Sequence, residues 1–114
     1  MIDKDDDVPS VRVFERAAEL FGLLATPVRL RIVSALCQGE KNVTELRGLI
    51  GVSQPNISQH LTTLYRSGAV ARRRHGSQVF YRIADEYYGL VCRAVASQVA
   101  GEEFNDSCVN IVNG

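Results

Sequence analysis

A change of hydrophobic periodicity in the middle of this sequence restricts its fold more than any other feature. Apolar residues recur at helical spacing over residues 43–50 and again over 54–66. The pattern then switches to alternation over 69–75 and 78–83, and Gly76-Ser77 between them is a typical tight turn. Two short helices followed by a hairpin are the outline of a helix-turn-helix with an attached β-hairpin.

The connection between the two helical patterns agrees with this outline. Gly51 is a typical helix stop, and Ser53 is a typical N-cap whose hydroxyl accepts a hydrogen bond from a first-turn amide. Pro55 then lies inside the first turn, where its missing N–H costs no helical hydrogen bond. We therefore expect a helix from about Ser53 to Arg66, held to the domain by its apolar face.

The rest of the chain is predicted to be helical. Ser10 begins a helix to about Leu24, Thr26-Pro27 one to about Gln38, Asn42 the short helix that ends at Gly51, and Asp85 a last helix to about Ala100. The predicted fold is mainly α with one β-hairpin, in the order ααααββα, which is a winged helix-turn-helix. At 114 residues we expect one domain over residues 10–103, a disordered acidic tail over 1–9 and a C-terminal tail over 104–114.

The charges are distributed unevenly, although the net charge is zero. Between Leu46 and Ala84 there are six arginines and no Asp or Glu. The remaining residues carry seven basic and thirteen acidic groups, so the central block is +6 and the rest is −6. A basic block of this kind predicts a polyphosphate partner.

The helix over 54–66 exposes amides and hydroxyls but no acid. Short side chains of this kind donate to and accept from base edges, whereas carboxylates are repelled by phosphates. A solvated face without a ligand is the alternative interpretation. The acid-free surroundings favour a DNA-reading helix, and the contacts predicted on it are Ser53, Gln54, Asn56, Ser58, Gln59, His60, Thr63 and Arg66.

The predicted hairpin carries four basic residues before its turn. Alternation places Arg72 and Arg74 on one face of the strand, and Arg73 and His75 on the other. Those near Gly76 are expected to reach the DNA backbone or a minor groove. A charged edge that blocks pairing between sheets is the alternative. The predicted contacts on the hairpin are Arg72, Arg74 and His75.

Three stretches of the sequence resemble the ArsR/SmtB family of bacterial winged-helix regulators. They are TPVRLRIVSAL, VTELRGLIGVSQPNISQHLTTLYRSGAV and RRHGSQVFYRI. The resemblance covers about residues 14–100. It implies a homodimer built from the first and last helices, operator DNA bound across the two-fold axis, and release by an inducer.

The apolar faces of residues 13–24 and 88–99 independently favour a dimer, because they exceed what one small core can cover. In such a dimer the two reading helices would lie roughly 34 Å apart, one turn of DNA, on an imperfect palindrome.

Several metal-binding positions of the resembling family hold other residues here. Asn42-Val43-Thr44 stands in place of a Cys-Val-Cys box. Asp85 is present, but Tyr87 occupies the place of a histidine. Thr63 and Ser67 stand where another branch has cysteines late in the reading helix. The chain is thus not expected to require a cofactor.

The three cysteines are the remaining sensor candidates: Cys37, Cys92 and Cys108. Together they could bind a soft metal or metalloid ion such as arsenite or cadmium, because such ions prefer thiolates. Alternatively, one exposed thiol could react with an oxidant or with reactive sulfur. A resembling branch senses persulfides or oxidants with one cysteine a turn before the position of Cys37. The structural alternative is that Cys37 and Cys92 are small buried apolar residues.

Other classes of protein fit the sequence less well. No catalytic grouping or phosphate loop is present, so we predict that the chain is not an enzyme. A winged helix that binds a protein, and a regulator without a small inducer, remain alternatives. No stretch has the about 20 apolar residues of a membrane span, and the acidic N-terminus does not resemble a signal peptide, so we expect a cytoplasmic protein without a membrane partner.

Overall fold

The computed structural model describes residues 10–101, so the tails expected over 1–9 and 104–114 lie outside the described residues. The described elements follow the predicted order, which confirms a mainly α winged helix-turn-helix, with one short strand added. They are α2 (Val11–Leu23), α3 (Pro27–Leu36), β1 (Lys41–Asn42), α4 (Val43–Ile50), α5 (Gln54–Arg66), β2 (Val70–His75), β3 (Gln78–Ile83) and α6 (Glu86–Ala100).

The helices begin where the sequence predicted, and side-chain caps set these boundaries; the caps at Ser10, Thr26 and Ser53 were themselves predicted. The hydroxyl or carboxylate of the N-cap accepts a first-turn backbone N–H at Ser10, Thr26, Ser53 and Asp85. Asn42 forms a capping box with Glu45, in which each side chain accepts the other's backbone N–H, at 2.8 and 2.9 Å. Gly51 ends α4 with φ +82°, a left-handed conformation that favours glycine.

The added strand, β1, has only two residues. It pairs with β3, so the antiparallel sheet has the order β1-β3-β2, with Lys41 opposite Tyr81 and Asn42 opposite Phe80. Two residues are too few to show an alternating pattern, and the sequence therefore did not predict this strand. The strand ties the start of α4 to the middle of β3.

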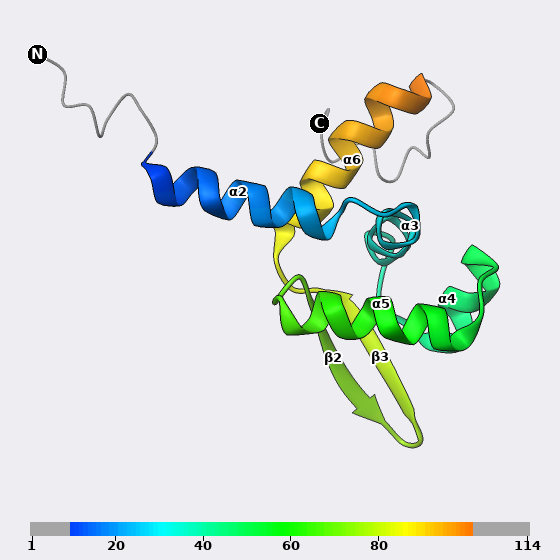
Figure 1. Ribbon diagram of the computed structural model, residues 1–114. Helices are drawn as coiled ribbons and strands as arrows, with labels where there is room; N and C mark the ends of the chain where they lie inside the picture. Colours follow the sequence, from blue (N-terminus) through cyan, green and yellow to red (C-terminus); the bar gives the residue numbers. More distant parts are fainter. Residues whose placement is uncertain (1–9, 102–114) are drawn as a thin grey trace, which may run out of the picture.

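The core lies where α3, α4 and α5 meet the sheet. Its fully buried side chains include Ile32, Leu46, Ile57, Leu61 and Leu64. Figure 1 shows α5 running across the hairpin on one side of the domain, while α2 and α6 extend from the other side. Within residues 10–101, no helix has both the length and the hydropathy that a membrane crossing needs.

Candidate nucleic-acid interface

Helix α5 has one apolar face and one polar face, and the tertiary structure uses them differently. Ile57, Leu61 and Leu64 are fully buried. The opposite face is exposed to solvent and includes Pro55, Gln59 and Arg66, whose spacings of four and seven residues place them on one side of the helix. Of the predicted contacts, Ser53, Gln54, Asn56, Gln59 and Arg66 are exposed, whereas Ser58, His60 and Thr63 are half-buried.

Ser53 is engaged as the helix cap. Its hydroxyl accepts the backbone N–H of Asn56 at 3.3 Å. This contact fixes the start of α5 and thereby the direction of Gln54 and Asn56, the exposed amides of the first turn.

The hydroxyls of the middle of α5 are also oriented by the helix itself. Thr62 donates its hydroxyl proton to the carbonyl of Ser58 at 2.9 Å, and Thr63 donates to the carbonyl of Gln59 at 3.2 Å. Each oxygen then presents lone pairs outward as an acceptor. Thr62 was not among the predicted contacts, although it follows Gln59 by three residues and precedes Arg66 by four, the spacing of one helix face.

His60 lies at the border between α5 and α3. Its Nδ1 accepts a hydrogen bond from Nε of Arg29 at 3.1 Å, and Arg29 also donates to the carbonyl of Leu23 at 3.2 Å. Burial lowers the pKa of His60 below its ordinary value, and the positive charge of Arg29 lowers it further. Because Nδ1 accepts the hydrogen bond from Arg29, the ring in this arrangement is neutral and carries its proton on Nε2. Its role as a DNA contact stays a prediction, and its structural role is to join the two helices.

The hairpin register places its basic residues on alternating faces, as the sequence predicted. Arg72 lies opposite Tyr81 and Arg74 opposite Val79, on the same side of the sheet as buried Val70. Arg73 lies opposite Phe80 on the other side, which it shares with His75.

The arginines of β2 have different partners. The guanidinium of Arg72 lies over the ring of Tyr65 at 3.9 Å, so the end of α5 supports it. Arg73 forms an ion pair with Glu40 at 2.7 Å and lies over the Phe80 ring at 5.0 Å. Arg74 has no ion pair with any described acid. The charge of Arg74 is therefore the one most available to a phosphate at the tip of the hairpin.

The two acids that most closely precede the basic block in the chain, Glu40 and Glu45, are both engaged. Arg73 donates hydrogen bonds to the carboxylate of Glu40 at 2.7 to 3.0 Å, which lowers the pKa of Glu40. Glu45 accepts the backbone N–H of Asn42 in the capping box. The pairing of Arg73 with Glu40 was not predicted, because 33 residues separate the two in the chain. The candidate interface, α5 and the α5-facing side of the hairpin, thus contains no acid.

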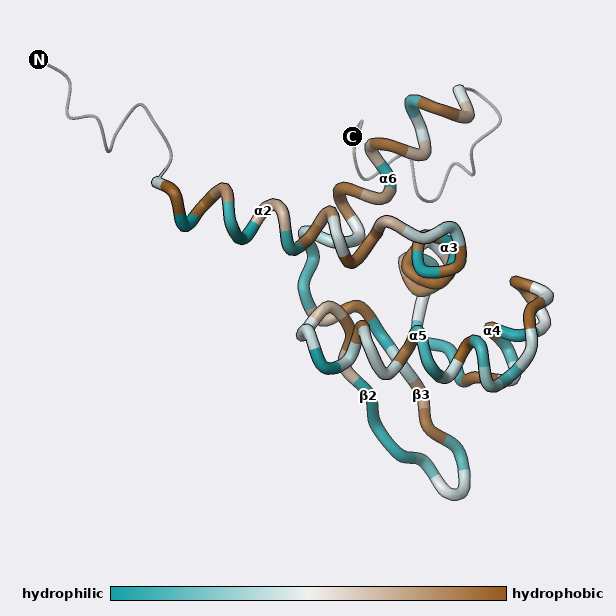
Figure 2. The backbone as a smooth tube through the Cα atoms, viewed as in Figure 1, coloured by the Kyte–Doolittle hydropathy of each residue, from teal (hydrophilic) through white to brown (hydrophobic). Residues whose placement is uncertain are grey.

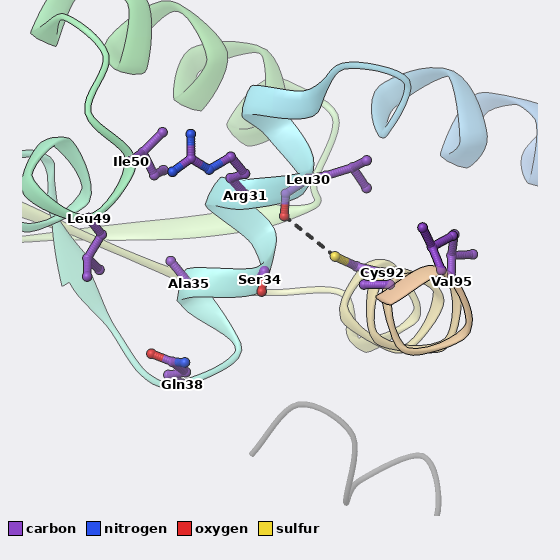
Figure 3. Close-up of a pocket in the computed structure, with 11 residues that line it drawn as sticks. Leu30, Arg31, Ser34, Ala35, Gln38, Leu49, Ile50, Cys92 and Val95 are labelled. Carbon is purple, nitrogen blue, oxygen red and sulfur yellow. Dashed lines mark hydrogen bonds between the residues drawn. The ribbon is translucent and has the colours of Figure 1, made fainter. Parts of the chain in front are cut away.

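The opposite side of the domain is apolar. Figure 2 shows hydrophobic stretches along α2 and α6, and several of these side chains are exposed: Phe14 and Phe21 at 59%, Val95 at 50% and Val99 at 82%. An apolar groove of about 490 Å³ runs between α3 and α6, with Leu30, Leu49, Cys92 and Val95 in its lining (Figure 3).

Two of the three predicted sensor cysteines lie in the described part of the chain, and Cys108 lies outside it. Cys92 is 2% exposed, and its thiol donates to the carbonyl of Leu30 at 3.5 Å, the dashed line of Figure 3. Cys37 is half-buried, caps the end of α3 and lines a second cavity, not the groove. Within residues 10–101, no three His, Cys, Asp or Glu side chains are grouped as a metal site. These two thiols therefore do not by themselves form a soft-metal site.

Comparisons with known proteins agree with this geometry. The family model described as "Bacterial regulatory protein, arsR family" matches residues 26–72. The chain is 41% identical over 96 residues to the HTH-type transcriptional repressor SmtB of Mycobacterium tuberculosis, covering 83% of this chain and 70% of that protein.

Two solved structures are also similar. The crystal structure of the transcriptional repressor BigR from Xylella fastidiosa has a TM-score of 0.74 and 35% identity, covering 86% of this chain and 96% of the other. The homodimeric winged helix-turn-helix domain of Mb0332 from Mycobacterium bovis has a TM-score of 0.66 and 30% identity, covering 86% and 90%.

Proposed function

Because the chain belongs to the ArsR/SmtB family of winged-helix transcriptional repressors, which are not enzymes, we propose that it binds an imperfect palindromic operator as a homodimer. The observation that carries this proposal is the acid-free polar face of α5 beside Arg74, an arginine near the hairpin tip that forms no ion pair with any acid in the described part of the chain. Such a surface complements phosphates and base edges together.

The proposed contacts divide into two classes. The exposed amides of α5, on Gln54, Asn56 and Gln59, are long enough to read base edges in the major groove. The hydroxyls, the arginines and the imidazole of His60 position the protein on the backbone, and Arg74 with His75 extends this contact to the flanking groove. The backbone class includes Ser53, Ser58, His60, Thr63, Arg66 and Arg72.

The proposed dimer is supported by the two terminal helices. Helix α2 has 13 residues and contains no buried side chain, so its apolar residues need a partner. The related Mb0332 domain is described as homodimeric. A two-fold dimer would place its α5 helices roughly 34 Å apart, on successive turns of the operator.

The proposed inducer acts through cysteine thiols. Cys37 lies at the end of α3, whose start is joined to α5 through Arg29 and His60. A change at this thiol can therefore reach the reading helix through one rigid element. A soft ion would require Cys108 together with Cys37 or Cys92, whereas an oxidant or reactive sulfur species requires only one accessible thiol.

Selection of bound fragments from a genomic library, followed by a salt titration of duplex binding, tests the DNA-binding proposal. We expect one enriched palindromic sequence, and affinity that falls steeply as salt is raised, because phosphate contacts release counterions. Binding that does not change with salt would contradict it and would favour a protein partner.

Operator release by arsenite, cadmium, peroxide and polysulfide then tests the inducer proposal. We expect one of these reagents to release the wild-type protein, and Cys→Ser variants at positions 37, 92 and 108 identify the thiol involved. Release by none of the four would contradict thiol sensing and favour a regulator without such an inducer.

A further inference from the structure

Arg93 of α6 is a buried cation without a carboxylate partner among residues 10–101. The residue is 9% exposed, and its Nε is buried with no hydrogen-bond partner. Its Nη1 donates to Sγ of Cys37 at 3.4 Å, and neither of the two ion pairs found among residues 10–101 includes it. A buried charge is strongly unfavourable unless a counter-charge or hydrogen bonds compensate it. The guanidinium therefore has the capacity to bind an anion.

The space for such an anion is next to this guanidinium. Arg93 and Cys37 line a cavity of about 470 Å³ between the end of α3, β3 and the start of α6, together with Tyr87 and Leu90. This volume is large enough for a small molecule. Glu86 also lines the cavity, but it precedes Arg93 by seven residues, about 10 Å along the helix axis. The cavity is therefore positive at the end where Arg93 contacts Cys37, away from the carboxylate of Glu86.

Gly89 leaves space on α6 for the contact between Arg93 and Cys37. A Cβ at position 89 would lie 3.2 Å from Nη1 of Arg93 and 3.3 Å from Sγ of Cys37. Glycine within a helix is otherwise unfavourable relative to alanine. Here its missing side chain leaves room for the guanidinium and the thiol to touch.

We propose that Arg93 and Cys37 form a small-anion site, at which the guanidinium holds a carboxylate or oxoanion through Nε–H and the thiol lies beside the bound anion. This proposal rests on the proposed thiol-based induction and restricts the class of inducer to anions that react with thiols. The guanidinium of Arg93 binds the charged group of such an anion and thereby holds its reactive atom next to Cys37. Arg93 is the positioning residue, and Cys37 is the residue modified.

Two alkylating reagents that differ in charge test this proposal. Iodoacetate is an anion, and iodoacetamide is its neutral analogue. In both reactions the sulfur of Cys37 attacks the methylene carbon, an S–C bond forms, the C–I bond breaks, iodide leaves with the electron pair, and the thiol proton passes to water. The measured quantity is the ratio of the two rates at Cys37, obtained by mass spectrometry of the full-length protein after digestion.

We expect Arg93→Met to lower the iodoacetate-to-iodoacetamide ratio at Cys37 by about tenfold, because it removes one close charge from a poorly solvated site. Arg31→Met is the matched control: it removes an exposed arginine of α3 that lines the other groove, and the ratio should stay unchanged. The ratio at Cys108 in the same samples is an internal control.

Gly89→Ala provides a second variant that keeps the charge. Its added methyl group displaces the guanidinium from the thiol while raising helix propensity, so the ratio should fall without loss of the fold. An equal ratio in wild type, Arg93→Met and Gly89→Ala would overturn the anion site. Operator binding by the unmodified proteins is measured separately, so failure of the anion site is distinguished from failure of the proposed DNA binding.

Discussion

Helices α5 and α6 have similar lengths, 13 and 15 residues, but distribute their residues in opposite ways. In α5, the three large aliphatic residues are fully buried and the polar residues face solvent. In α6, an arginine is buried while Leu90, Val95 and Val99 are exposed. An exposed face indicates the chemistry of its partner, so α5 fits a polar, charged ligand and α6 fits another apolar surface.

The same contrast separates the two sides of the domain. The side with α5 and the hairpin holds the basic block, with its nearest acids engaged by Arg73 and by the α4 cap. The side with α2 and α6 holds the exposed phenylalanines and valines and the groove between α3 and α6. Loss of apolar contact between copies should therefore affect DNA binding more than loss of any single polar contact.

The largest effect is expected for Val95→Glu. A charge placed in the apolar surface of α6 should dissociate the proposed dimer and lower operator affinity roughly 10²-fold, because the second half-site is no longer bound by a linked subunit. Light scattering after size-exclusion chromatography measures the mass, and fluorescence anisotropy measures the affinity. Gln98→Glu adds the same charge at a position that is already polar and should keep the dimer. An intact dimer in Val95→Glu would contradict the assignment of this face.

An intermediate effect is expected for Gln59→Ala. Loss of one bidentate base contact should cost about 1–3 kcal/mol on the operator and little on unrelated duplex DNA. The ratio of the two dissociation constants is the measurement. Gln38→Ala removes another exposed amide, at the end of α3, and serves as the matched control. An equal loss on both duplexes would mean that Gln59 does not read a base.

The smallest effect is expected within the hairpin, from Arg74→Ala compared with Arg73→Ala. Arg74→Ala should reduce the slope of log affinity against log salt by about one, since one phosphate contact is lost. Arg73 is held by Glu40, so its removal should change the slope less. Equal slopes in the two variants would show that the ion pair with Glu40 does not decide which arginine meets DNA.

Most of the secondary structure could be predicted because its causes are local. The caps at Ser10, Thr26, Asn42, Ser53 and Asp85 act within three residues of the helix start. The apolar periods identify α5, and the turn at Gly76-Ser77 identifies the hairpin. The residues of the candidate interface could be predicted from the same patterns, because exposed positions recur about every 3.6 residues on a helix and every second residue on a strand. The comparisons confirm the family, and the individual DNA contacts stay predictions.

The partners of individual side chains could not be predicted. His60 was expected at DNA without its contact to Arg29, 31 residues away. Arg73 was left out of the predicted contacts because alternation placed it on the other face, but its ion pair with Glu40 was not predicted. Thr62 was left out although its spacing placed it with Gln59. Cys37 was a sensor candidate by elimination, and its contact with Arg93 comes from residues 56 apart.

Apart from the two-residue strand β1, the sequence by itself determined which residues form helices and strands, and which of their faces are polar. Those properties depend on caps, turns and periodicity within a few residues. Only the tertiary structure decided which cations are already paired and which are available, because an ion pair depends on where the fold places residues that are distant in the chain. That difference separates Arg73 from Arg74 at the hairpin, and it makes the buried Arg93 a candidate anion site.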